Sequence, residues 1–319
     1  MVHSGVTAQV PAAAESAEQP TAADLEAADG RLRGRVRRTP VIQLPAADLG
    51  TPWPLTLKLE LLQHTGSFKA RGALNSVLTM PPGAPEVVAA SGGNHGAAVA
   101  WAAREAGVRA TVFVPAAAPA VKQDSIRRYG ADLRLVDGFY ADALAASLAF
   151  AAERGAVRVD AYDAPATVAG QSTVGAELAT QVAPGDLVVV ACGGGGLFAG
   201  VALALAGRNP VFAAEPEAAP SLAAAVAAGR PVDVTVGGVA VDSLGAGRAG
   251  RIALGVALAQ DARVLLVPDD AIRAARDRLW RSLRVAAEPG GATALAAVLQ
   301  HATDLDVAGV TVVVSGGNA

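Results

Sequence analysis

Few residues in this chain can act as an amine nucleophile. Of its 26 lysines and arginines, only Lys58, Lys69 and Lys122 are lysines. Arginine cannot replace them, because a guanidinium stays protonated and does not form a Schiff base. Lys69 lies in Gln63-His-Thr-Gly-Ser-Phe-Lys-Ala-Arg-Gly-Ala73, where the pattern predicts the first turn of a helix. The positive end of the helix dipole disfavours an ammonium ion there and favours the neutral, nucleophilic amine.

Three segments join an apolar strand to a turn of small residues. They are Val87-Val-Ala-Ala-Ser-Gly-Gly-Asn-His95, Leu187-Val-Val-Val-Ala-Cys-Gly-Gly-Gly-Gly-Leu197 and Val310-Thr-Val-Val-Val-Ser-Gly-Gly-Asn318. In the second segment, successive N–H groups before a predicted helix would bind an anion. A tight strand–helix connection would need one glycine rather than four in a row, so we expect a phosphate. No Gly-Lys-Ser/Thr follows, and no acid stands at the spacing of a dinucleotide fingerprint, so a nucleotide is not implied.

Strands and helices alternate along most of the chain and must position these turns. The predicted strands are 54–60, 87–90, 110–114, 133–136, 187–192, 211–214, 263–267 and 310–314. The predicted helices are 21–32, 67–79, 95–106, 120–129, 141–154, 172–181, 197–206, 220–228, 269–283 and 291–299. These strands are too apolar to face water. The expected fold class is therefore α/β, with two open, mainly parallel sheets, helices on both faces, and a cleft at the carboxyl ends of the strands.

Composition and charge argue against several kinds of partner and location. The net charge of −3 gives no electrostatic reason to expect nucleic acid or an anionic membrane. The single cysteine, Cys192, cannot form an intramolecular disulfide and favours a cytoplasmic location. Residues 187–207 are uncharged and long enough to span a bilayer, but the glycines interrupt them, so a buried strand, turn and helix is favoured over a membrane span. Residues 1–20 lack the features of a signal peptide and predict a disordered tail.

Four motifs in a fixed order point to a known family. They are Thr65-Gly-Ser-Phe-Lys-Ala-Arg-Gly-Ala73, Ser91-Gly-Gly-Asn-His95, Gly193-Gly-Gly-Gly-Leu197 and Ser315-Gly-Gly-Asn318. With them, the chain resembles the serine/threonine dehydratases, which are fold-type II pyridoxal-phosphate enzymes related to serine racemase and the tryptophan synthase β subunit. The resemblance implies a tryptophan-synthase β-like homodimer with pyridoxal 5'-phosphate in an interdomain cleft. Residues 21–85 and 164–319 would form the large cofactor-binding domain, and 86–163 a small mobile domain.

The resemblance also implies a role for individual residues. Lys69 would bind the cofactor covalently and act as the base at the substrate Cα. The rest of the cofactor would be held by Phe68 and Glu288 beside the ring, Asn94 at the phenolic oxygen, Ser315 at the pyridine nitrogen, and Gly193, Gly194, Gly195, Gly196 and Leu197 at the phosphate. The amino-acid substrate would be bound by Ser67, Ser91, Gly92, Gly93, Asn94, His95 and, near its hydroxyl, Asp242. A structural role for Asp242, as a turn or cap residue beside Gly245, is an equally good explanation of its presence.

These implied roles favour elimination of a β-hydroxyl group. A hydroxyl partner such as Ser315 makes the cofactor a weaker electron sink than a carboxylate partner would, so prompt loss of the leaving group is favoured over a long-lived carbanion. A phosphate without a cationic partner could protonate the departing hydroxyl. The expected reaction converts a β-hydroxy amino acid, such as L-threonine or L-serine, to a 2-oxo acid and ammonia.

Three other functions remain as alternatives. A racemase needs a base on the second face of the substrate, and serine racemase has a serine where this chain has Gly92, so racemisation is disfavoured. A β-replacement synthase on the same scaffold stays open, because the sequence does not show how long the intermediate survives. A protein that binds the cofactor without catalysis could dispense with Lys69, which is present.

The family's cation site is altered in this sequence. Glu215 aligns with its first ligand, and the carbonyl of Ala219 could be a second. Ser221 stands where an aspartate is expected. Because hard cations need several oxygen ligands, preferably carboxylates, we expect a weakened or lost site, and a bound divalent or monovalent cation is doubtful.

Overall fold

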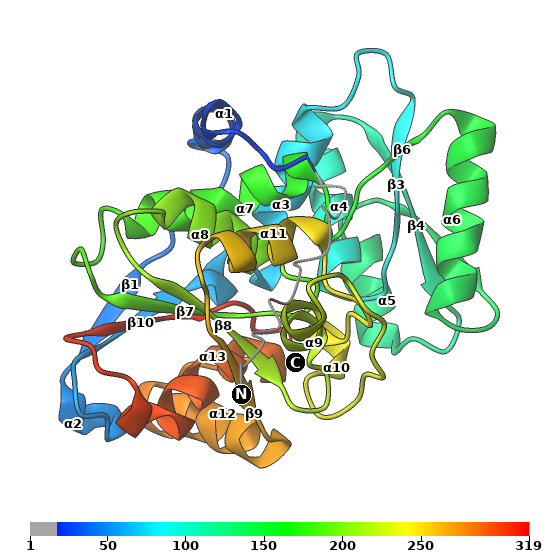
Figure 1. Ribbon diagram of the computed structural model, residues 1–319. Coiled ribbons are helices and arrows are strands. Elements are labelled where there is room, and N and C mark those ends of the chain that lie inside the picture. The colour runs from blue at the N-terminus through cyan, green and yellow to red at the C-terminus, as the bar shows by residue number, and fades with distance from the viewer. Residues whose placement is uncertain (1–17, 319) are drawn as a thin grey trace, which may run out of the picture.

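The computed structural model describes residues 18–318 and contains a large and a small sheet (Figure 1). The six-stranded sheet has the order β1 (Val41–Leu44), β2 (Leu55–Leu59), β10 (Val310–Val314), β7 (Leu187–Ala191), β8 (Val211–Pro216) and β9 (Val264–Val267). Only the β1–β2 pair is antiparallel among its strands. The four-stranded sheet has the order β5 (Asp132–Val136), β4 (Arg109–Pro115), β3 (Glu86–Ala90) and β6 (Val157–Arg158), all parallel. The predicted α/β class with two mainly parallel sheets is confirmed.

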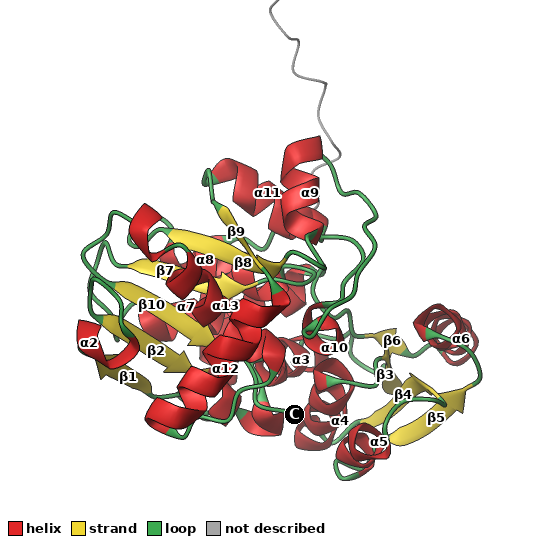
Figure 2. Ribbon diagram, turned by 90° about the horizontal axis from the view of Figure 1, so that it is seen from below, coloured by secondary structure: helices red, strands yellow, loops and turns green. Residues whose placement is uncertain are grey.

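Helices cover both faces of each sheet (Figure 2). They are α1 (Ala22–Leu32), α2 (Ala46–Leu49), α3 (Lys69–Leu78), α4 (Asn94–Ala106), α5 (Ala120–Arg127), α6 (Tyr140–Arg154), α7 (Pro165–Leu178), α8 (Gly196–Leu205), α9 (Ser221–Ala228), α10 (Val241–Leu244), α11 (Arg251–Ala259), α12 (Asp269–Leu283) and α13 (Pro289–Gln300). Short 3-10 helices lie at Glu60–Leu62, His64–Gly66 and Ala302–Asp304.

The period-two alternation of a strand divides the core of the large sheet into two layers. Val189 on β7 packs with α12 and α13, whereas its neighbours Val188 and Val190 pack with α7, α8 and α11. In the small sheet, Val87 packs toward α3 and α4, and Val88 toward α6. Strands β3 and β7 are thus buried on both faces, which explains their continuous apolar runs. The expectation that no strand faces water is wrong for β5, whose residues Asp132, Arg134 and Leu135 are exposed at the edge of the small sheet.

Helix α7 differs most from its prediction. The sequence predicted a helix over 172–181, but the observed helix starts at Pro165, a residue well suited to a first helical turn. Its residues from Thr167 to Gly175 are all buried, because α7 lies between α3 and α8. A helix buried on all sides has no polar face, so periodicity gives no signal for its start. The elements β1, α2, β6, α10 and α11 were also not predicted.

Two predictions concern the disordered N-terminal tail and the uncharged run 187–207. Residues 1–17 of the predicted tail, and residue 319, lie outside the described part of the chain, while Pro20 is buried. Thr21 caps α1 by accepting the N–H of Asp24. The uncharged run 187–207 forms β7, the glycine turn and α8. Within residues 18–318, no helix is both long enough and apolar enough to cross a bilayer. The small sheet falls inside the range 86–163, whose movement as a domain stays a prediction.

Candidate active site

Lys69 is the first residue of helix α3, and the loop before it forms main-chain hydrogen bonds with the loop after β10. The N–H of Phe68 donates to the carbonyl of Ser315 at 3.1 Å, and Ser67 forms a β-bridge with Gly316. The N–H of Gly317 donates to the carbonyl of Gly66 at 3.0 Å. These bonds bring the first and last of the sequence motifs to one place at the carboxyl edge of the large sheet.

The amine of Lys69 has only a neutral partner among the described residues. Its Nζ donates to the carbonyl of Ala161 at 2.7 Å and lies 5.1 Å from the centre of the Phe68 ring. Burial lowers the pKa of Lys69 to about 8, against the opposing effects of the carboxylates of Asp160 and Glu288. A larger fraction of neutral amine is therefore present near neutral pH than for an ordinary lysine, as a nucleophile or a base requires.

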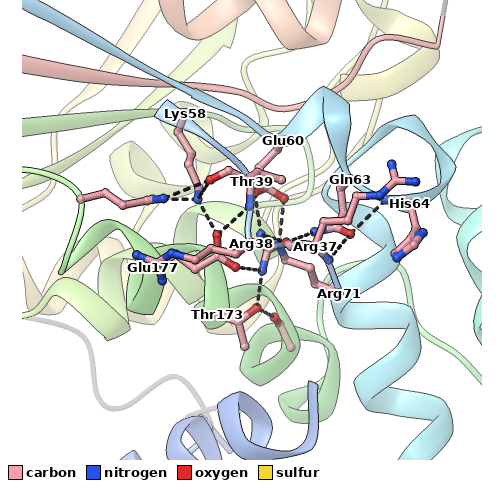
Figure 3. Close-up of polar contacts among 12 residues, drawn as sticks. Arg37, Arg38, Thr39, Lys58, Glu60, Gln63, His64, Arg71, Thr173 and Glu177 are labelled. Carbon is pink, nitrogen blue, oxygen red and sulfur yellow. Dashed lines mark hydrogen bonds and ion pairs between the residues drawn. The ribbon is translucent and has the colours of Figure 1, made fainter. Parts of the chain in front are cut away.

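A buried charge network surrounds Arg71 near the start of α3 (Figure 3). Arg71, two positions after Lys69, is fully buried and donates to both carboxylate oxygens of Glu60, at 2.7 and 2.8 Å. Its third nitrogen donates to Glu177 on α7 at 2.7 Å. Glu177 also accepts from the buried Lys58 on β2. The network ties the start of α3 to β2 and α7, and sequence reasoning assigned no role to Arg71.

The glycine turn after β7 offers main-chain donors. Gly195 has a φ of 92°, a left-handed conformation that favours glycine, and caps α8. Within residues 18–318, the N–H groups from Gly193 to Leu197 donate to no protein acceptor. The side where a Cβ would stand is filled: such an atom on Gly194 would lie 2.3 Å from the Tyr162 ring. Unpartnered N–H groups at a helix start fit the phosphate of the implied cofactor.

Two hydroxyl groups beside Lys69 are poorly satisfied. Ser67 Oγ is buried and has no hydrogen-bond partner in the described chain. Ser315 Oγ reaches only the carbonyl of Gly290, at a long 3.4 Å. Buried polar atoms without partners are uncommon in native structures, so both hydroxyl groups retain hydrogen-bonding capacity that a ligand would use. Together with the free N–H groups of the glycine turn, they fit a phosphorylated aldehyde on Lys69.

Asn94 links the start of α4 to the large sheet. Its Nδ2 donates to Glu288 Oε1 at 2.7 Å, and its Oδ1 accepts from Asn318 at 2.8 Å. Asn318 also donates to the carbonyl of Thr65 at 2.7 Å. Burial raises the pKa of Glu288 to about 7, against the opposing effects of the Asn94 hydrogen bond and of the cations Lys122 and Arg276. The structure thus brings Asn94 and Glu288 together and adds Asn318, which stands in a predicted motif but had no assigned role.

The turn before α4 presents further unpartnered N–H groups. Ser91 Oγ accepts from the N–H of Gly93 at 3.2 Å, while the N–H groups of Gly92, Asn94 and His95 have no acceptor within residues 18–318. The His95 ring is buried instead, with Nε2 3.0 Å from the carbonyl of Val159. Burial lowers the pKa of His95 to about 4. His95 can therefore offer its main-chain N–H to a carboxylate, but not a charged side chain.

A cavity of about 190 Å³ opens in front of this turn. Its lining includes Gly92, Asn94, Glu288, Lys122 and Asp242. The two last residues form an ion pair, with Nζ 3.0 Å from Oδ2. The structure therefore places Asp242 at the same cavity as the predicted residues Gly92, Gly93 and Asn94, whereas Ser67, Ser91 and His95 do not line it. It also identifies Lys122 as the partner of Asp242, which the sequence did not indicate.

Asp160 and Tyr162, which sequence reasoning missed, lie beside the site. Asp160 Oδ1 accepts the N–H groups of Tyr162 and Asp163, at 3.0 and 2.8 Å. Burial raises the pKa of Tyr162 to about 12, and its ring covers Gly194. Both follow strand β6, and polar residues directly after a strand of a parallel sheet were the signal that could have found them.

In the structure, Glu215 binds the start of helix α9, and a cation at this position stays doubtful. Its carboxylate accepts the N–H groups of Leu222 at 2.7 Å and Ala223 at 2.9 Å, at the start of α9. Ser221 donates its hydroxyl to the carbonyl of Ala246. Burial raises the pKa of Glu215 to about 7. These two hydrogen bonds make Glu215 a cap of helix α9. Among the described residues, no group of three or more His, Cys, Asp or Glu is arranged to hold a metal ion.

Comparisons with known proteins agree with the cofactor that this geometry fits. Residues 32–317 match the family described as pyridoxal-phosphate dependent enzyme. An L-threonine ammonia-lyase of Geobacter sulfurreducens is 36% identical over 92% of this chain and 74% of its own length. A serine racemase of Oryza sativa subsp. indica is 35% identical over 91% and 88%. The structure of maize serine racemase superposes with a TM-score of 0.88 at 33% identity, covering 95% of this chain and 94% of the other.

Proposed function

Because the chain belongs to the pyridoxal-phosphate-dependent enzymes, we propose that it removes the β-hydroxyl and the amino group from a β-hydroxy amino acid such as L-threonine or L-serine. The products are a 2-oxo acid and ammonia. The single observation that carries the proposal is the amine of Lys69, which has a lowered pKa and a neutral hydrogen-bond partner. Relatives named threonine ammonia-lyase and serine racemase are about equally similar, so they support the family rather than the reaction.

The residues of this chain divide the work as follows. The bound cofactor supplies an electron sink for the electrons of the Cα–H bond. The N–H groups from Gly193 to Leu197 would hold its phosphate, and Ser315 and Asn94 its ring. The N–H groups of Gly92, Asn94 and His95 would hold the substrate carboxylate at the start of α4, where the helix dipole favours an anion.

Lys69 would then remove the proton from Cα. A base works best when its pKa is close to the working pH, and a pKa of about 8 meets this condition. The network around Arg71 holds the start of the helix that carries this amine, which supports a fixed backbone position for Lys69.

Gly92 argues for elimination over racemisation. A second base is needed to return a proton to the other face of Cα, and glycine has no side chain to provide one. A Cβ at this position would lie 2.9 Å from Cγ1 of Val114, so a serine could enter only if Val114 moved. Because the space around position 92 fits only a glycine without movement of Val114, it supports a reaction with one base.

Release of 2-oxo acid and ammonia from a panel of β-hydroxy amino acids tests the proposal. We expect release from L-serine or L-threonine, with little D-serine formed. Accumulation of the enantiomer without ammonia would replace the proposal by a racemase. Incorporation of an added nucleophile at Cβ would indicate a β-replacement synthase, and binding of cofactor without turnover a non-catalytic protein.

We further propose that the protein works as a homodimer in the cytoplasm, and that residues 86–163 close over the substrate. The hydrogen bonds of Asn94 to Glu288 and Asn318 join that range to the large sheet, as closure requires. Sedimentation equilibrium tests the dimer. Hydrogen exchange of residues 86–163, with and without substrate, tests the closure.

A further inference from the structure

The three lysines of the chain have three different environments. Lys58 is fully buried in the charge network, and Lys69 stands at the cofactor site. Lys122 lies on α5 and lines the cavity in front of Gly92 and Asn94. Neither the comparisons nor the proposed reaction assigns a role to Lys122.

Lys122 is paired across the cavity rather than along its own helix. Its partner is Asp242 on α10, and the two residues lie on opposite sides of the cleft between the small-sheet and large-sheet regions. The exposed fraction of the Lys122 side chain is 27%, whereas that of Asp242 is 78%. The carboxylate is therefore the more exchangeable partner, because it leaves the pair at a small cost in desolvation.

The position of the pair relates it to the substrate side chain. In the proposed function, the substrate carboxylate lies at the N–H groups of Gly92, Asn94 and His95. Gly92 and Asn94, together with the ion pair, line a cavity of about 190 Å³. A substrate held there by its carboxylate would present its Cβ group to this cavity, where Asp242 and Glu288 are the acidic neighbours and Lys122 and Arg128 the basic ones.

We propose that the ion pair of Lys122 and Asp242 determines the substrate class. Asp242 pairs with Lys122, the cation that would otherwise bind a second carboxylate of the substrate. The enzyme therefore prefers small uncharged β-hydroxy amino acids. This inference rests on the proposed function. A substrate such as 3-hydroxyaspartate would have to displace Asp242 from Lys122 and would meet its repulsion. Discrimination through an unfavourable charge contact is a common source of specificity.

The test compares kcat/KM for 3-hydroxyaspartate with that for L-serine in holoenzyme variants. Wild type should favour L-serine. Asp242→Asn frees Lys122 and should raise the ratio for 3-hydroxyaspartate about tenfold, the size of one hydrogen bond to a charged group. Adding Lys122→Met should remove this gain, because no free cation then remains at that position.

Asp124→Asn is the matched control. Asp124 lies on the same helix and forms an exposed ion pair of the same length with Arg127, but it does not line the cavity. This variant should leave the ratio unchanged. A similar shift in Asp124→Asn would mean that any loss of charge on α5 acts at a distance, which would overturn the proposal.

A binding measurement separates this inference from the proposed reaction. L-Aspartate and L-alanine lack a β-hydroxyl, so their binding, followed by the absorbance of the bound cofactor, does not depend on elimination. Asp242→Asn should tighten L-aspartate about tenfold relative to L-alanine. An equal change for both ligands, or a gain that survives Lys122→Met, would show that the pair only joins α5 to α10. Failure of 2-oxo acid release alone would overturn the reaction but not this ligand preference.

Discussion

Two regions of the molecule bury ionisable side chains near the start of α3, and the pKa values of these side chains shift in different directions. In the network around Arg71, Lys58 and Arg71 form ion pairs with Glu60 and Glu177. In the cleft, Lys69 contacts a carbonyl, and Glu288 contacts an amide. Against the effect of burial, Arg71 and Lys58 lower the pKa of Glu60, and the two glutamates raise the pKa of Arg71. In the cleft, burial lowers the pKa of Lys69 to about 8 and raises that of Glu288 to about 7.

The difference teaches that the charge of the partners, and not burial alone, decides how Glu60 and Arg71 titrate, although burial still lowers the pKa of Lys58 despite its contact with Glu177. A buried ion with opposite charges at hydrogen-bond distance stays ionised and acts as structure. A buried ionisable group with neutral partners titrates near neutral pH and can move a proton. The first region therefore positions the second, since Arg71 and Lys69 share the first turn of α3.

Replacing Lys69 tests the cleft side of this comparison and has the largest expected effect. Lys69→Ala should lose the covalent cofactor adduct, and 2-oxo acid release should fall at least about a thousandfold, because both the attachment and the base are lost. Mass spectrometry after borohydride reduction locates the adduct. Lys122→Met is the control and should keep the adduct on Lys69. An adduct on Lys58 or Lys122 in the wild-type holoenzyme would contradict the assignment.

Replacing Arg71 tests the paired side. Arg71→Met leaves Glu60 and Glu177 with only Lys58, and the free energy of unfolding should fall by about 3–5 kcal/mol. Urea unfolding measures this loss. Arg33→Met removes an exposed arginine that pairs with Asp29, and should cost less than about 1 kcal/mol. Equal effects of the two changes would show that the buried network is not what stabilises α3.

Glu288→Gln sharpens the comparison through pH. Because the pKa of Glu288 is about 7 in the folded chain and ordinarily 4.5, the folded state binds more protons between these values. Wild-type stability should then fall as pH rises from about 4.5 to 7, by up to about 3 kcal/mol from this residue. The glutamine keeps an acceptor for Asn94 but does not titrate. In cofactor-free protein, the free energy of unfolding of the variant minus that of wild type should therefore rise over this pH range and level off above it. A constant difference would mean that Glu288 titrates normally.

Removal of cations has the smallest expected effect. Glu215 is a third kind of buried carboxylate, held by the N–H groups of Leu222 and Ala223 rather than by a cation. A chelator should therefore leave both the melting temperature and the rate of 2-oxo acid release unchanged. Loss of activity with EDTA, reversed by Mg²⁺, would show instead that a cation binds at Glu215 and competes with α9 for its oxygens.

Local patterns determined much of this protein from its sequence alone. The apolar runs predicted the central strands, since a parallel sheet buries both faces of each strand. Consecutive glycines between a strand and a helix predicted the main-chain donors from Gly193 to Leu197, because that property belongs to a few adjacent residues. The scarcity of lysine made Lys69 a candidate nucleophile, because composition does not depend on the fold.

Only the tertiary structure decided which distant residues meet. The partners of Arg71, the contact of Asn94 with Glu288 and Asn318, and the pairing of Lys122 with Asp242 all join separate elements. The full length of α7 was hidden too, because a helix buried on every side has no polar face to reveal its period. A pKa depends on burial and on partners brought together by folding, so the reactivity of Lys69 and the charge of Glu288 were set by packing rather than by neighbours in the chain.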